Sequence, residues 1–269
     1  MPRKKRARLT WSVGWDNPIG DNRERWHVKG KPLPNPSGYP SQRKVKKFRA
    51  CLLEWFERYG RKFPWRNSST SKYQFIMAEI LLQRTRAETV AKFFPTFTRE
   101  LSSWKKLDQV TIGELENLLQ PIGLWRRRAS SIKSLAREMA NRNGRFPSDR
   151  SEIESLPGIG QYIANAILLF CHGEPQPLLD GNMARVLERV FGPRTMADIR
   201  YDPYLQKLAL DIVQCITPKE VNWAILDLAA KICIAKKPSC YKCPLSDICR
   251  YCKKMKLLTY QQMPSHDNS

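Results

Sequence analysis

The sequence lacks long apolar runs and is poor in acidic residues. No stretch reaches the roughly 18 apolar residues of a membrane-spanning helix, and the amino terminus lacks the apolar segment of a secretory signal. Only 25 Asp and Glu face 47 Lys and Arg, which gives a formal net charge of +22. We therefore expect an intracellular protein without a membrane, in the cytoplasm or nucleoid if the source is prokaryotic. Its partner is expected to be a polyanion, although ribosomal and membrane-surface proteins share this charge.

Alternating patterns typical of paired strands are absent as well. Apolar residues instead recur at three- and four-residue spacing, first in Phe48, Leu52 and Trp55. The same period returns in 132–139, 163–170, 205–213 and 221–228. These patterns predict an all-α fold.

The two ends of the chain have their own composition. Residues 1–42 combine a basic run at positions 3–8 with Pro32, Pro34, Pro36 and Pro40, which disfavour long helices. We expect a basic flexible arm here, acting as a solvated tail, a DNA tether or an import signal. Residues 253–269 are expected to form a short polar and basic tail.

A glycine-containing turn lies between two helical stretches, in Leu156-Pro157-Gly158-Ile159-Gly160. Two glycines spaced two apart allow neighbouring backbone N–H groups to point outward, and the helix that follows adds the positive end of its dipole. The segment therefore predicts either a seat for a backbone phosphate of a nucleic acid or an ordinary connection between helices.

Asp180 stands about twenty residues later, after two leucines and directly before an expected helix. Its simplest role is an N-cap. A carboxylate at the mouth of a cleft is also suited to cleavage of an N-glycosidic bond, because positive charge develops on the sugar and a fixed anion stabilises it.

Four of the eight cysteines crowd near the carboxyl end with the spacing C-x6-C-x2-C-x5-C, at Cys233, Cys240, Cys243 and Cys249. In a reducing compartment this clustering favours metal ligation over disulfides. Four thiolates fit either a zinc ion or a 4Fe-4S cluster. Cys252 is interpreted as a spare cysteine.

These motifs, in this order, resemble those of the endonuclease III superfamily of helix-hairpin-helix DNA glycosylases over residues 63–249. The resemblance implies two lobes with DNA across the cleft between them. A six-helix barrel would span 70–174, and a discontinuous helical lobe would combine 43–69 with 175–252. It also implies that the four cysteines hold a 4Fe-4S cluster rather than zinc.

The resemblance places the family's catalytic aspartate on Asp180. Members that nick DNA carry a lysine at the position of Tyr162, and a tyrosine cannot form their Schiff base. The chain therefore looks like a monofunctional hydrolase. Glu79, flanked by Ile and Leu, matches a glutamate that protonates the departing purine in adenine glycosylases and contacts the flipped pyrimidine in mismatch enzymes. Its simpler interpretation is a helix-surface charge.

Several residues are similar to the family's DNA contacts. Gln83 matches a residue that fills the hole left by the extruded base, and Leu124 matches a wedge that enters the duplex. Arg126, Arg127 and Arg128 follow the wedge and are placed either for phosphates or on a solvated basic face. Leu156, Gly158 and Gly160 would hold a phosphate.

The substrate is expected to be double-stranded DNA with thymine or uracil mispaired with guanine, bound by a monomeric base excision repair enzyme. Tyr162 favours this choice, since adenine glycosylases usually have serine there. Only twenty residues follow Cys249, whereas adenine glycosylases usually continue into a further domain. The alternatives are an adenine glycosylase acting opposite guanine or 8-oxoguanine, and a non-catalytic DNA-binding protein with a structural cluster.

Overall fold

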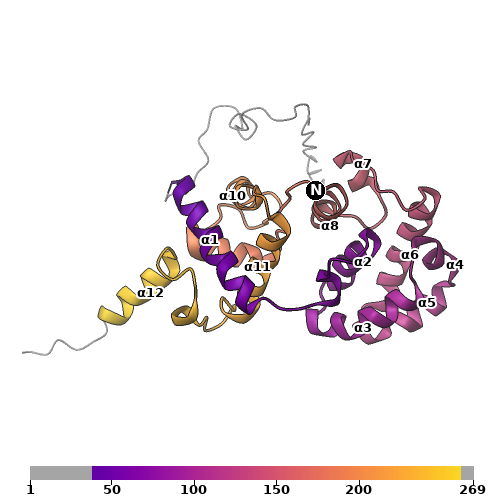
Figure 1. Cartoon of the computed structure of the whole chain (residues 1–269), viewed down its shortest axis with the longest axis horizontal. Coiled ribbons are helices and arrows are strands. Elements are labelled where there is room, and N and C mark those ends of the chain that lie inside the picture. The colour runs from indigo at the N-terminus through magenta and orange to yellow at the C-terminus, as the bar shows by residue number, and fades with distance from the viewer. Residues whose placement is uncertain (1–37, 262–269) are drawn as a thin grey trace, which may run out of the picture. The chain divides into compact units, whose positions relative to one another are not determined.

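The computed structural model describes residues 38–261, and every regular element in this range is a helix (Figure 1). The all-α prediction is confirmed. The α-helices are α1 (Gln42–Tyr59), α2 (Lys72–Leu82), α3 (Ala87–Glu100), α4 (Trp104–Gln109), α5 (Ile112–Leu119), α6 (Trp125–Asn141), α7 (Arg150–Ser155), α8 (Gln161–Ile167), α9 (Gly181–Phe191), α10 (Pro203–Val213), α11 (Pro218–Lys231) and α12 (Arg250–Gln261). A π-helical turn, Leu168–His172, extends α8.

Short polar side chains define where many of these helices begin. Ser71 and Gln74 form a reciprocal capping box at the start of α2, and Thr111 and Glu114 form another at α5. Single N-caps are provided by Ser41 in α1, Ser103 in α4, Asp149 in α7 and Asp202 in α10. Each cap accepts a hydrogen bond from an N–H group that the first turn leaves unpaired.

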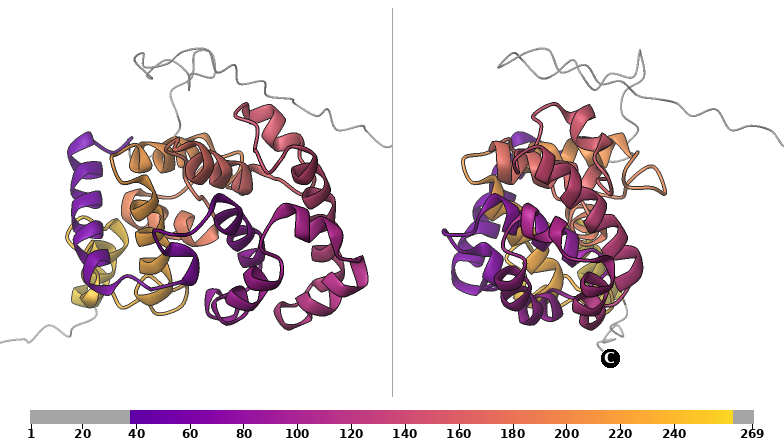
Figure 2. Two further views of the ribbon diagram at one scale, coloured as in Figure 1. Left: turned by 45° about the vertical axis from the view of Figure 1, so that its right-hand side comes forward. Right: turned by 90° about the vertical axis from the view of Figure 1, so that its right-hand side faces the viewer.

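Two separate apolar cores lie within residues 38–255. The first contains buried residues between Phe63 and Leu178 and is built mainly by α2 to α8. The second combines the buried face of α1 with residues 179–252. The chain therefore returns to α1 after completing the first core, and α1 packs against α10 and α11 although they are far apart in sequence (Figures 1 and 2).

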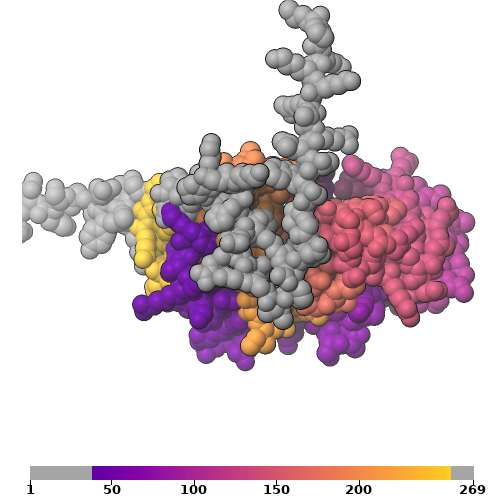
Figure 3. Space-filling model, turned by 90° about the horizontal axis from the view of Figure 1, so that it is seen from above, coloured from indigo at the N-terminus to yellow at the C-terminus, as the bar shows by residue number. Residues whose placement is uncertain are grey.

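The first core begins at Phe63, so the stretch between α1 and α2 passes from one core to the other. We propose that the two cores are the two lobes expected from the sequence. In the space-filling view, α1 in indigo and α12 in yellow lie on one side, and much of the first core, in magenta and red, lies on the other (Figure 3).

Buried ion pairs hold the stretch between α1 and α2 against α11 of the second core. Asp227 of α11 is fully buried and accepts hydrogen bonds from the backbone N–H and Nε of Arg61 at 2.7 and 2.8 Å. Both terminal nitrogens of Arg66 also bind this carboxylate, at 2.9 and 3.1 Å. Because a buried carboxylate requires such partners, these ion pairs fix the segment that leads into the first core.

The structure describes only part of the arm and of the tail that the sequence predicts at the two ends of the chain. Most of the predicted arm, residues 1–37, lies outside the described residues, and so does the last part of the predicted tail, 262–269. The first part of that tail is helical, because α12 continues to Gln261. Among the described residues, no helix combines the length and apolar character needed to cross a bilayer.

Candidate active site

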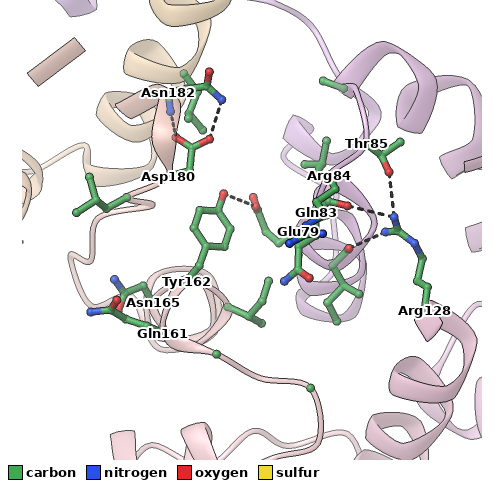
Figure 4. A pocket seen from close by; sticks show the side chains of 18 of the residues that line it. Glu79, Gln83, Arg84, Thr85, Arg128, Gln161, Tyr162, Asn165, Asp180 and Asn182 are labelled. Atoms are coloured by element: carbon green, nitrogen blue, oxygen red, sulfur yellow. Dashed lines mark hydrogen bonds between the residues drawn. The ribbon is translucent and has the colours of Figure 1, made fainter. Parts of the chain in front are cut away.

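A large cavity of about 1100 Å³ is lined by residues of both cores. Its walls include Glu79 and Gln83 from the end of α2, Tyr162 from α8, and Asp180 from the start of α9 (Figure 4). The three residues predicted to be catalytic therefore meet in one cavity, although 83 positions separate Glu79 from Tyr162.

Glu79 lies on the buried side of α2 and is only 4% exposed. The Tyr162 hydroxyl donates a hydrogen bond of 2.9 Å to its Oε2 atom. Burial raises the pKa of Glu79 to about 7, although this bond and the charge of Arg66 oppose the shift. The interpretation as a helix-surface charge is therefore wrong, since this carboxyl group is buried and changes protonation state near neutral pH.

Tyr162 occupies the first turn of α8 and faces the cavity opposite Asp180 (Figure 4). Burial and the neighbouring Glu79 and Asp180 carboxyls raise its pKa well above the ordinary value. The phenol therefore keeps its proton and acts as a hydrogen-bond donor. It has no amine with which to attack a sugar.

Asp180 has the N-cap position of α9 that the sequence suggested. Its Oδ1 atom accepts hydrogen bonds from the backbone N–H groups of Asn182 and Met183 at 2.9 and 2.8 Å, and its Oδ2 atom accepts one from the Asn182 amide at 2.7 Å. All three groups donate to Asp180, as the ionised carboxylate requires. The capping role and a place on the cavity wall are therefore compatible.

A chain of hydrogen bonds leads from Asp180 toward the cysteine segment. Asn182, which binds Asp180, accepts a hydrogen bond from Nη2 of Arg185 at 3.1 Å. The Nε of Arg185 binds the backbone oxygen of Cys233 at 2.9 Å. Asp180 is thus linked through Asn182 and Arg185 to the backbone of the cysteine segment.

Sequence reasoning missed the cation beside Glu79. Arg66 lines the cavity, and its guanidinium lies 5.2 Å from the centre of the Trp223 ring and 5.0 Å from that of Phe63. Its position depends on Asp227, which is remote in sequence. Arg66 follows a Pro-Trp pair at the end of a basic segment, and nothing in that pattern separates it from the chain's many other arginines.

The glycine turn adopts the bend that its sequence predicts. Gly158 has a φ of +75°, and a Cβ atom there would lie 2.1 Å from the Ser131 hydroxyl oxygen, so glycine is required. Gly158 and Gly160 line the cavity, and Gly160 begins α8. Leu156 does not reach this surface, because it is 4% exposed and belongs to the first core.

Gln83, predicted to fill the hole left by the extruded base, and Leu124, the predicted wedge, lie on two turns beside the cavity. Gln83 is exposed at the end of α2, and Leu124 is 55% exposed before α6 with a left-handed φ of 54°. Both line the cavity. An exposed leucine in a conformation that costs energy is unusual, so core packing does not explain Leu124.

The three arginines after Leu124 have different environments. Arg127 is exposed and lines the cavity, whereas Arg126 is exposed, lies over the Trp125 ring at 5.6 Å and is not part of the cavity wall. Arg128 is 8% exposed and binds backbone oxygens at the end of α2. Neither interpretation made for Arg128, a phosphate contact or a solvated basic face, fits a buried side chain.

The four predicted ligands, Cys233, Cys240, Cys243 and Cys249, line one small cavity against α9 and α11. Burial raises the pKa of Cys243 to about 12, and neighbouring cysteines contribute to this shift. Cys252, expected to be spare, is 3% exposed and lines the same cavity. No group of three or more His, Cys, Asp or Glu side chains in the described part of the chain is placed to hold a single metal ion.

Comparisons with known proteins identify the family. Residues 77–209 match the family model described as HhH-GPD superfamily base excision DNA repair protein. A thymine-DNA glycosylase of Aeropyrum pernix is 38% identical over 213 residues, covering 77% of this chain and 95% of that protein. A thymine/uracil-DNA glycosylase of Pyrobaculum aerophilum is 35% identical over 217 residues, covering 77% and 93%.

More distant and structural relatives agree with this result. An adenine DNA glycosylase of Arabidopsis thaliana is 31% identical over 242 residues, covering 78% of this chain but 37% of that protein. The solved structure of a thermostable thymine-DNA glycosylase has a TM-score of 0.73 and 32% identity, covering 79% of this chain and 98% of that one. The resemblance found in the sequence is therefore confirmed, and this chain belongs to the HhH-GPD superfamily of base excision DNA repair proteins.

Proposed function

We propose that this protein is a monofunctional DNA glycosylase that hydrolyses the N-glycosidic bond of thymine or uracil mispaired with guanine. The observation that carries the proposal is the pair of carboxyl groups, Glu79 and Asp180, which line one cavity together with Tyr162. The names of the relatives from Aeropyrum and Pyrobaculum support the choice of base.

Asp180 is the anion that faces the deoxyribose of the extruded nucleotide. Loss of the base gives the sugar the character of an oxocarbenium ion, and a carboxylate already oriented by three N–H donors stabilises that charge without reorganising. The same carboxylate orients water for attack on the sugar carbon. The base leaves, water adds, and an abasic site remains.

Glu79 and Tyr162 form the base pocket. With a pKa of about 7, Glu79 holds a proton on a substantial fraction of molecules at neutral pH. Tyr162 donates to Oε2 of Glu79, so the other oxygen of the protonated carboxyl group is left to carry the proton toward the base. We infer that this group donates a hydrogen bond to a carbonyl oxygen of the departing pyrimidine, where negative charge accumulates.

Tyr162 also determines what happens after the base has left. A lysine at this position would attack the sugar and lead to strand nicking, whereas a protonated phenol does not form an imine. The product is therefore an intact strand with an abasic site, which breaks only on heating or with alkali.

The DNA-binding residues surround this pocket. Gln83 fills the hole left by the extruded base, and Leu124 supports the distorted base step as an apolar wedge. The turn of Leu156 to Gly160 offers backbone N–H groups to a phosphate, with Leu156 anchoring the turn from the core. Arg126 adds a phosphate contact outside the cavity. The excess of basic residues supplies the general attraction to DNA.

Cys233, Cys240, Cys243 and Cys249 hold a 4Fe-4S cluster in this proposal. Their thiols surround a common cavity and are free of disulfides, as thiolate ligands must be. All four ligands lie within residues 233–249, so a bound cluster would cross-link this segment to itself. Exposed Lys236, Lys237 and Lys242 on this segment would face DNA.

Removal of adenine opposite guanine or 8-oxoguanine is the second candidate. The match to an adenine DNA glycosylase favours it, as does the raised pKa of Glu79, because protonation of a purine requires an acid near neutral pH. A DNA-binding protein without catalysis remains the alternative of another class.

A panel of duplexes that each contain one mispair tests these functions. We expect release of thymine or uracil opposite guanine, followed by strand breakage only after alkali. Release of adenine but not of thymine would establish the second candidate. No release from any mispair or lesion, together with tight DNA binding, would establish the binding-only alternative. Spontaneous nicking with an adduct trapped by borohydride would contradict the role of Tyr162.

A further inference from the structure

Arg128 crosses from the first turn of α6 to the end of α2 (Figure 4). Its Nη1 atom donates to the backbone oxygens of Ile80 and Leu81 at 3.0 and 2.9 Å. Its Nη2 atom donates to the backbone oxygen of Gln83 at 3.1 Å and to the hydroxyl of Thr85 at 3.0 Å. One guanidinium group therefore holds both sides of the turn that contains Gln83.

Thr85 extends this connection to the turn that contains Leu124. Its hydroxyl, which accepts the hydrogen bond from Arg128, donates to the backbone oxygen of Ile122 at 3.3 Å. Arg128 itself lies one helical turn after Leu124, and its backbone N–H binds the Leu124 oxygen at 3.0 Å. The two turns are thus joined by Arg128 directly and by Thr85 indirectly.

Both turns have backbone conformations that need support. Arg84, directly after Gln83, has a φ of 58°, and Leu124 has a φ of 54°. Residues with a Cβ atom adopt this left-handed region at an energetic cost, so the surrounding contacts must hold them there. The hydrogen bonds of Arg128 go to Gln83 and Thr85, on either side of Arg84, and to the backbone oxygen of Leu124.

The charge of Arg128 is also unusual for a buried side chain. All its hydrogen bonds to described residues go to neutral oxygens, and burial lowers its pKa. The carbonyl groups at the end of α2 carry the negative end of the helix dipole and partly compensate the cation. Burying a cation without a carboxylate partner costs free energy. We therefore look for a role of Arg128 in placing the two turns and not in stabilising the fold.

We propose that Arg128 is a positioning residue that joins the turn of Gln83 to the turn of Leu124, so that both side chains enter the duplex as one rigid unit. The inference rests on the proposed function, in which these two side chains insert beside the extruded base. Arg128 does not touch the DNA. It sets the spacing between the two inserted residues.

Arg128→Lys is the sharpest test, because lysine keeps the charge but lacks the planar fork that reaches four acceptors. We expect its single-turnover rate of base release to fall by roughly 10- to 100-fold, as expected for a displacement of about 1 Å in a reacting assembly. Affinity for a fully paired duplex should stay unchanged, since phosphate contacts remain. Arg137→Lys, on the exposed side of α6, is the matched control and should behave as the parent.

A second background separates positioning from a general loss of structure. In a protein that already carries Gln83→Ala and Leu124→Ala, Arg128→Lys should change the rate little, because the residues it positions are gone. A loss of the same size in both backgrounds would overturn the proposal. Should Arg128→Lys fail to fold, Thr85→Val replaces it in the same cycle, since it keeps the cation and removes the hydroxyl link. Its effect should be several-fold.

A fluorescence readout distinguishes failure of this inference from failure of the proposed function. 2-Aminopurine placed beside the mispair brightens when its neighbour leaves the stack, whether or not a bond is cut. We expect Arg128→Lys to reduce this signal while the parent and Arg137→Lys show it fully. A normal signal in Arg128→Lys would contradict the proposal even in an active enzyme. A parent that unstacks the base without releasing it would contradict only the proposed catalysis.

Discussion

Two of the carboxyl groups that line the active-site cavity, Glu79 and Asp180, lie on different walls and in opposite environments. Glu79 lies buried on α2, and its side chain accepts a hydrogen bond from the hydroxyl of Tyr162. Asp180 lies at the start of α9, where two backbone N–H groups and the Asn182 amide donate to it. Burial without N–H donors favours the protonated acid, and three N–H donors favour the anion.

This difference assigns complementary tasks to the two side chains. A group that holds a proton near neutral pH suits the departing base, and a fixed anion suits the positive sugar. The comparison also explains why one residue type, a carboxylic acid, serves both ends of the same bond. Replacing Asp180 should therefore lower the rate of base release, whereas replacing Glu79 should mainly change its pH dependence.

Replacing the anion should have the largest effect. In Asp180→Asn the amide oxygen still caps α9, but the negative charge that faces the sugar is lost. We expect the single-turnover rate to fall by roughly 10³-fold, the size found for removal of a preorganised electrostatic contact. Asp149→Asn, which changes the exposed N-cap of α7, is the control and should keep full activity. Equal rates for Asp180→Asn and the parent would remove Asp180 from the mechanism.

Disrupting the cysteine cavity should have the next largest effect and tests whether the predicted ligands hold a cluster that stabilises the second core. Cys243→Ser should lose bound iron and lower the free energy of unfolding by about 3 kcal/mol or more, because metal binding is coupled to folding. Cys252→Ser is the matched control, since Cys252 lines the same cavity outside the predicted ligand set. Iron content and thermal unfolding measure both. Iron retained in Cys243→Ser but lost in Cys252→Ser would reverse the ligand assignment.

Replacing Glu79 should change the pH dependence more than the maximal rate. In the parent, the protonated fraction of Glu79 falls as pH rises through about 7, so base release should slow by up to about tenfold per pH unit above that value. Glu79→Gln cannot lose a proton and keeps a donor, so its profile should be flat over this range. A variant that retains the parent's inflection would show that another group titrates.

Removing the Tyr162 hydroxyl should have the smallest effect. Tyr162→Phe abolishes one neutral hydrogen bond, for which a loss of about 3- to 10-fold in rate is expected. That bond lowers the pKa of Glu79, so the inflection of the pH profile should move to higher pH. An unchanged inflection would mean that the two side chains are not coupled. Tyr162→Phe and Glu79→Gln should both leave the DNA strand intact until alkali is added.

The sequence predicted which residues line the cavity better than it predicted their contacts. The N-cap position of Asp180 is a local feature and was visible in the sequence, whereas its catalytic role came from the family resemblance and stays a prediction. The bond between Glu79 and Tyr162 depends on the packing of α2 against α8, which no local pattern encodes. Arg128 was misjudged for the same reason. An arginine after an exposed turn suggests a phosphate contact, and only the fold reveals that α2 ends beside it.

Long-range partners also explain what was missed. The placement of Arg66 beside the pocket requires Asp227, which lies 161 positions away. The helical period is a short-range property, and it predicted the fold class correctly. The cysteine spacing is short-range too, and the four cysteines line one small cavity, but their role as cluster ligands stays a prediction. The separate environments of the two carboxyl groups come from tertiary packing and could not be predicted residue by residue.

Infrared spectroscopy of the Glu79 carboxyl group tests the assignment of the proton donor most directly. The difference spectrum between the parent and Glu79→Gln should contain a protonated carboxyl band at pH 6 that converts to a carboxylate band as the pH rises through about 7. A Glu79 group that is already ionised at pH 6 would contradict this assignment.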